Sequence, residues 1–164
     1  MYHGSDGMVQ EECDQPQNGL AELLRMQMQS QGVSVRCLVA EGLIRKSQRN
    51  HFFRRVADGS LYHSEINAVM NRLSIDPIRA AIAINCFRNP ETYEDPCLAT
   101  TAELATSLAV ELTEELAACA GNFQPLRKAH CKGLAKRTAA EIAQNHARME
   151  QSLDDFAYGA RAFG

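Results

Sequence analysis

Apolar residues recur at helical spacing along most of this chain, and strand-like alternation is absent. Good helix formers such as Ala, Leu, Glu, Gln and Arg dominate, whereas Val and Ile are few. In the first predicted helix, over residues 19–31, the apolar positions are Leu20, Leu23, Leu24 and Met28. The sequence therefore predicts an all-α protein.

Capping and turn residues divide the first half of the chain into five short predicted helices. Gly32 ends the first helix, and Ser34 is placed to cap the second. A basic third helix follows, and Ser60 begins an apolar fourth one. Asp76 precedes a proline, a combination that favours the start of a fifth helix because proline is tolerated at the first helical position. We expect these helices to form one domain over residues 19–87.

Two long helical patterns follow a segment at 88–97, whose two prolines indicate a hinge or a one-turn helix. One pattern covers about 98–120 and has a leucine every four residues, and Gly121-Asn122 is expected to end it. The other covers about 125–157, and its seven-residue repeat consists of Ile142, Met149 and Phe156, with Leu153 on the same side. Such a stripe requires a partner helix. We expect an antiparallel hairpin over 98–158, with a homodimer through these helices as the alternative.

The charge is unevenly distributed. Residues 20–80 contain nine Lys and Arg residues and five acidic ones, a net charge of +4. Because the whole chain carries −3, the remainder carries −7. Five of the nine basic residues lie within residues 45–55, which contain no acid. The first half is therefore suited to an anionic partner.

Several other classes of protein are disfavoured by the sequence. No apolar run approaches the roughly 20 residues that a membrane span requires. The polar segment 1–18 lacks the features of a secretory signal and is expected to be a flexible arm. The six cysteines form no C-x-x-C pair, so we expect most of them to be small buried residues in a reducing cytosol. A cytoplasmic protein without a metal or another cofactor is predicted.

Catalytic motifs are not found in the sequence. It contains no G-x-S-x-G, no glycine-rich phosphate loop and no H-E-x-x-H. His146 and Glu150 lie one helical turn apart, but a single pair at this spacing is usually a surface contact. The sequence therefore predicts that the protein is not an enzyme.

The order of elements in residues 20–80 resembles the phage-repressor (lambda-repressor-like) helix-turn-helix domains. The stretches that carry the resemblance are LAELLRMQMQSQGVS, for the first helix and its turn, and VADGSLYHSEINAVMNRLSIDPIRAAI, for the closing helices. Two features depart from the family. Val35 stands where the family often has glutamine, and Gly42 follows Ala40 too closely for the usual Ala-x-x-x-Gly turn. These departures predict a remodelled turn.

The resemblance implies that a recognition helix begins near residue 45 and enters the major groove of double-stranded DNA. The residues expected to read base edges are Arg45, Gln48, Arg49 and Asn50. Those expected to contact phosphates, which fix position without reading sequence, are Arg36, Lys46 and Arg54. Phe52 and Phe53 are expected to anchor this helix, and because adjacent residues cannot both point inward, one of them should be partly exposed.

Together these features predict a sequence-specific, DNA-binding transcriptional regulator of repressor type. Its first half would bind DNA, and its C-terminal helices would form a homodimer or bind a partner. The alternative is a small all-helical adaptor or anti-activator that binds another protein through the Leu and Met stripes of the C-terminal helices. In that case the basic stretch would be an ordinary solvated helix surface.

Overall fold

A computed structural model describes residues 16–119 and 126–162, and side chains for 18–119 and 126–152. These residues form helices joined by short connections and contain no strand, so the all-α prediction is confirmed. The chain divides into two compact units between Glu115 and Leu116, and each unit is described by itself. Most of the predicted arm at 1–18 and the helix end predicted at Gly121-Asn122 lie outside the described residues.

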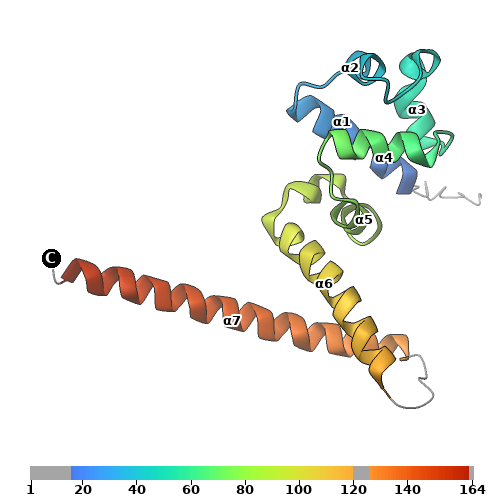
Figure 1. Cartoon of the computed structure of the whole chain (residues 1–164). Coiled ribbons are helices and arrows are strands. Elements are labelled where there is room, and N and C mark those ends of the chain that lie inside the picture. Colours follow the sequence, from blue (N-terminus) through green and yellow to red (C-terminus); the bar gives the residue numbers. More distant parts are fainter. Residues whose placement is uncertain (1–15, 120–125, 163–164) are drawn as a thin grey trace, which may run out of the picture. The chain divides into compact units, whose positions relative to one another are not determined.

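The first unit contains helices α1 to α5, two 3-10 helices and most of α6 (Figure 1). The elements are α1 (Pro16–Ser30), α2 (Val35–Ala40), η1 (Lys46–His51), α3 (Phe52–Ala57), α4 (His63–Arg72), α5 (Pro77–Asn85), η2 (Pro90–Glu94) and α6 (Pro96–Ala118). The second unit contains the end of α6 and the long helix α7 (Lys128–Ala162). None of the helices in the described part of the chain combines the length and apolar character of a membrane span.

Four helices of the first unit end in the same hydrogen-bond pattern. After α2, the N–H of Gly42 donates to the Val39 carbonyl (3.1 Å) and the N–H of Leu43 donates to the Leu38 carbonyl (2.9 Å). Gly42 has φ +75°, which glycine adopts without steric cost. This is the Schellman motif. It also ends α1, α3 and α4, where the residues with positive φ are Gly32, Gly59 and Ser74.

Two predicted helix starts are confirmed by their caps. The Ser34 hydroxyl accepts a hydrogen bond from the Cys37 N–H (3.3 Å) at the start of α2. The Asp76 carboxylate accepts one from the Arg79 N–H (2.8 Å), and Pro77 occupies the first position of α5. Each cap satisfies a backbone donor that has no partner inside its helix.

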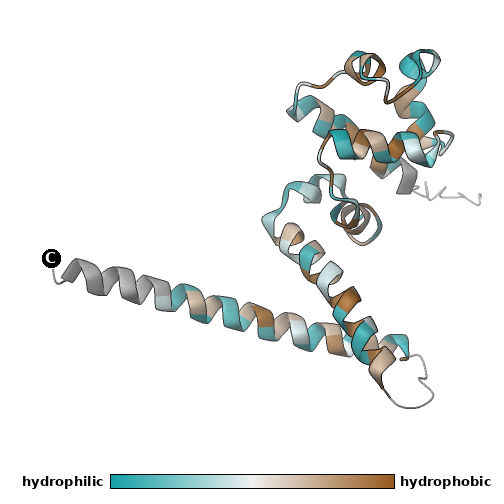
Figure 2. Ribbon diagram, viewed as in Figure 1, coloured by the Kyte–Doolittle hydropathy of each residue, from teal (hydrophilic) through white to brown (hydrophobic). Residues whose placement is uncertain are grey.

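The hydrophobic core of the first unit is formed by the inward faces of its helices. In Figure 2 brown, apolar segments lie on α1, α4 and α5. The largest apolar side chains under 2% exposed are Leu23, Leu24, Leu38, Val56, Val69 and Leu73, and Phe52 is 2% exposed. Burying each such side chain contributes about 1.5–3 kcal/mol to folding.

The core continues beyond α5. The segment 88–97, predicted as a hinge or a one-turn helix, contains the short helix η2. Tyr93 of η2 is buried, and its hydroxyl accepts a hydrogen bond from the Asp76 N–H (2.9 Å). Leu98 and Ala102, in the first turns of α6, are buried as well. The start of α6 is thereby packed into the first unit.

The prediction that most cysteines are buried is wrong for those that the structure describes. Cys37, Cys86, Cys97, Cys119 and Cys131 are all exposed. They lie on outward faces or at helix ends, and larger aliphatic side chains fill the core in their place. A hydrogen bond with the Ser34 side chain lowers the pKa of the exposed Cys37 thiol.

Candidate nucleic-acid interface

The basic stretch at 45–55 forms the last residue of the turn after α2, the 3-10 helix η1 and most of α3. Three apolar side chains anchor it, because Ile44, Phe52 and Val56 are buried. Phe53 is partly buried and meets Phe52 edge to face, with ring centroids 5.1 Å apart. The prediction that one of the two phenylalanines is partly exposed is confirmed.

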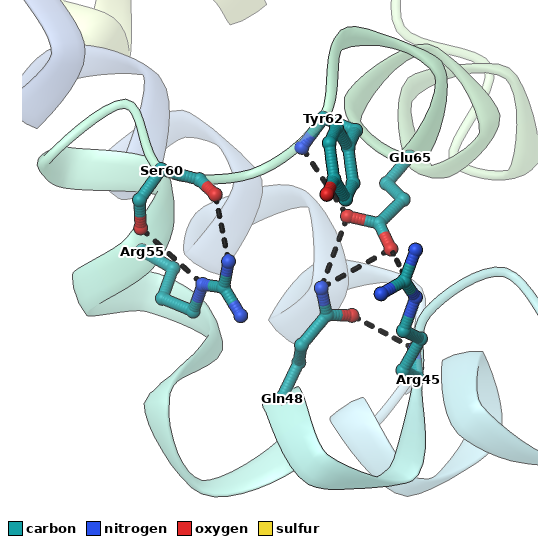
Figure 3. A network of polar contacts seen from close by, with 6 residues as sticks. All are labelled: Arg45, Gln48, Arg55, Ser60, Tyr62 and Glu65. Carbon is teal, nitrogen blue, oxygen red and sulfur yellow. Dashed lines mark hydrogen bonds and ion pairs between the residues drawn. The ribbon is translucent and has the colours of Figure 1, made fainter.

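Gln48 belongs to the same stretch and is also buried, with only 2% of its surface exposed. Its Nε2 donates to both carboxylate oxygens of Glu65 (3.1 Å each), and its Oε1 accepts from the Arg45 N–H (2.8 Å). Glu65 also accepts from the Tyr62 N–H (3.2 Å), as Figure 3 shows. This placement corrects the prediction that Gln48 reads adenine, because a buried amide with these partners is not presented to a base.

Arg45 stands at the rim of the same network. Its Nε lies 3.7 Å from a Glu65 carboxylate oxygen (Figure 3), and its guanidinium lies over the Tyr62 ring, 5.2 Å from the centroid. The Arg45 side chain is still 66% exposed. Arg45 is therefore oriented by its neighbours and remains accessible to a ligand.

Lys46, Arg49 and Asn50 project from η1 and are exposed. In a 3-10 helix, residues three apart lie one above the other, so Lys46 and Arg49 share a row and Asn50 lies in the next row. The Arg49 Nε donates to the Asn50 Oδ1 (3.3 Å). A guanidinium and an amide are thus coupled side by side on the outer face of η1.

Arg36 of α2 and Arg54 of α3 are also exposed. Among the residues whose side chains are described, neither these two nor Lys46 and Arg49 form an ion pair with an acid. Hydrogen bonding from Ser60 lowers the pKa of the Asp58 carboxyl, and the nearby charges of Arg54 and Arg55 lower it further without forming an ion pair. Four cations on α2, η1 and α3 therefore remain exposed without a paired carboxylate.

The other four basic residues within 20–80 serve the fold. Arg55 donates to the Ser60 carbonyl (2.7 Å) and hydroxyl (3.3 Å), which closes the turn after α3. The Arg72 guanidinium binds Glu41 at 2.7 and 3.2 Å, which ties the end of α4 to the end of α2 and raises the pKa of Arg72. The remaining two guanidinium groups lie over aromatic rings and belong to Arg25 (over Phe53) and Arg79 (over Tyr93).

Comparison with known proteins adds no relative for this chain. No protein-family model, curated protein or solved structure matches it. Among the described residues, no group of three or more His, Cys, Asp or Glu side chains is arranged to hold a metal ion. The function is therefore inferred from the side chains on α2, η1 and α3.

Proposed function

We propose that the first unit is a helix-turn-helix domain of the phage-repressor type and that the protein is a sequence-specific, DNA-binding transcriptional regulator. The observation that carries this proposal is the set of exposed cations without carboxylate partners on α2, η1 and α3. Unpaired cations are what a phosphate backbone attracts, since each contact releases a condensed counterion. In this proposal α2, the turn around Gly42 and η1 with α3 form the helix-turn-helix.

The outer face of η1 is the proposed reading surface. Arg49 supplies the donors that fit the O6 and N7 acceptors of guanine, and Asn50 supplies the donor and acceptor that fit adenine. Their mutual hydrogen bond restricts both side chains before DNA is bound, which lowers the entropy lost on recognition. Arg45, held by Glu65 and Tyr62, is a third base-reading candidate at the start of η1.

Phosphate contacts are assigned to Arg36, Lys46 and Arg54, which come from three separate elements. Contacts of this kind set the position of a protein on the duplex without reading its sequence. Gln48 takes a positioning role in this scheme. By joining the Arg45 backbone to Glu65, it fixes η1 against α4 and so determines where Arg49 and Asn50 project.

The proposal is tested by selecting genomic fragments on the full-length protein and titrating the best ones by fluorescence anisotropy. Three phosphate contacts predict that log K falls with log salt at a slope of about −3 per protomer. Arg137→Ala, which removes one exposed charge from α7, should leave the affinity unchanged. The proposal fails if no fragment binds better than bulk DNA or if binding does not respond to salt.

A protein-binding adaptor or anti-activator is the second candidate function, and one observation favours it. Along α6 a row of leucines is about half exposed, consisting of Leu104, Leu108 and Leu112. Exposed apolar rows of this kind mark protein interaction surfaces. This function would be favoured over the first if the protein bound no DNA fragment and a stable, stoichiometric protein partner purified with it from nuclease-treated lysate.

A further inference from the structure

The long helix α7 carries a heptad stripe, apolar except for His146, whose described side chains are not buried within the second unit. The stripe follows alternating spacings of four and three residues through Ala135, Ala139, Ile142, His146 and Met149, and the sequence continues it to Phe156. All five named residues up to Met149 are exposed. In Figure 2 hydrophobic and hydrophilic segments alternate along α7. A repeat sustained over several heptads is typical of a coiled coil.

We propose that this stripe packs against the same stripe of a second copy of the chain, with the two α7 helices antiparallel. In the register that centres on residue 144, Ile142 faces the partner's His146 and Ala139 faces the partner's Met149. Each layer then joins a smaller side chain to a larger one, which fills the seam evenly. A parallel pair would instead place Ala139 against alanine, which leaves a gap, and His146 against histidine.

The charged residues beside the stripe select this register. Lys136 and Glu150 occupy equivalent positions two heptads apart on the same edge of the stripe, and Glu150 also lies 3.6 Å from the His146 ring of its own helix. In the antiparallel pair Lys136 faces the partner's Glu150, and the two-fold axis repeats the contact. In a parallel pair the same two groups would be separated by about 21 Å along the axis. Asn145 would meet the partner's Asn145 near the axis, where two amides can exchange hydrogen bonds.

The length of α7 favours a second copy of the chain, rather than α6, as the partner that covers the stripe. α7 contains 35 residues and α6 contains 23, and the first turns of α6 are buried in the first unit at Leu98 and Ala102. Beyond Ala102, α6 has 16 residues, fewer than the 22 from Ala135 to Phe156, so α6 cannot cover the whole stripe. α6 also has four acids and no base, so it offers Glu150 no cation.

The proposal is tested by reversing these charges in the full-length protein. The dimer dissociation constant is measured by sedimentation equilibrium in the absence of DNA. Lys136→Glu and Glu150→Lys should each raise the dimer dissociation constant roughly 10-fold, because each change acts twice in a symmetric dimer. The double variant should return to within about 3-fold of the original value, since the pairs are re-formed with reversed sign. His146→Leu should tighten the dimer by removing a polar ring from the seam.

Glu141→Lys and Arg148→Glu are the matched controls. The two positions are one heptad apart on the outer face of α7, away from the stripe, so each change should leave the dissociation constant unchanged. A wild-type protein that stays monomeric at all concentrations overturns the proposal. So does a double variant as weak as the single ones, since the opposed charges are then not partners. Because no DNA is present, a negative result leaves the proposed DNA binding standing, and loss of DNA binding leaves this interface standing.

Discussion

Replacing Gln48 with methionine is expected to destabilise the first unit without altering its surface charge. The side chain is buried and joins η1 to α4: it donates to Glu65 of α4 and accepts from the backbone N–H of Arg45, which precedes η1. Methionine has a similar length and volume, so the packing around the site is largely kept. The substitution therefore isolates the hydrogen bonds of Gln48 from the space that it fills.

The magnitude follows from the bonds that are lost. The hydrogen bonds to the Glu65 carboxylate contribute about 1.5–3 kcal/mol, and the bond from the Arg45 N–H contributes about 1 kcal/mol. In the variant the Glu65 carboxylate lies beside an apolar thioether, and the Glu65 side chain is only 12% exposed. The Tyr62 N–H is then its remaining hydrogen-bond donor. A loss of about 3 kcal/mol is expected, which for a unit of this size lowers Tm by roughly 15 °C.

Differential scanning calorimetry of the full-length variant measures this loss, and DNA selection on the same protein measures its sequence preference. Gln29→Met is the control, because Gln29 is an exposed glutamine of α1 and its replacement should change stability by less than about 0.5 kcal/mol. If Gln48→Met leaves Tm unchanged but alters the preferred DNA sequence, Gln48 reads a base and the positioning role assigned to it is refuted.

Three further predictions concern recognition and the fold. Arg49→Ala should relax the DNA sequence preference and weaken the best site about 10- to 100-fold, whereas Arg54→Ala should weaken all sites alike and reduce the salt slope by about 1 in anisotropy titrations. Ser74→Gly should raise the free energy of unfolding by about 0.5 kcal/mol in urea titrations, because Ser74 has φ +53° at the end of α4. Gly19→Ala should stabilise the protein by less than the roughly 0.5–1 kcal/mol that alanine gains over glycine inside a helix, because the new methyl group would lie 2.9 Å from Ile84 Cγ2, and a full gain would contradict the close approach of α1 and α5.

The all-helical class and several helix ends were predictable because their determinants are local. Helical periodicity marks α1, and the turn residues Gly32 and Gly59 mark helix ends within one or two positions. The caps Ser34 and Asp76 act on residues three positions away, which a single sequence displays directly. The exposure of the cysteines was not predictable in this way, because their type favours burial and only the packed structure shows that their positions face outward.

The candidate site was less predictable because two of its determinants are not local. The partner of Gln48 is Glu65, 17 positions away on a different helix, and no spacing rule connects them. The backbone of residues 46–51 is 3-10 rather than α, which changes the residues that share a face. An α-helix would align Arg45 with Arg49, whereas the 3-10 helix aligns Lys46 with Arg49 and turns Gln48 inward. A duplex that meets η1 would therefore encounter one row containing Lys46 and Arg49 beside the amide of Asn50, and it would not meet Gln48.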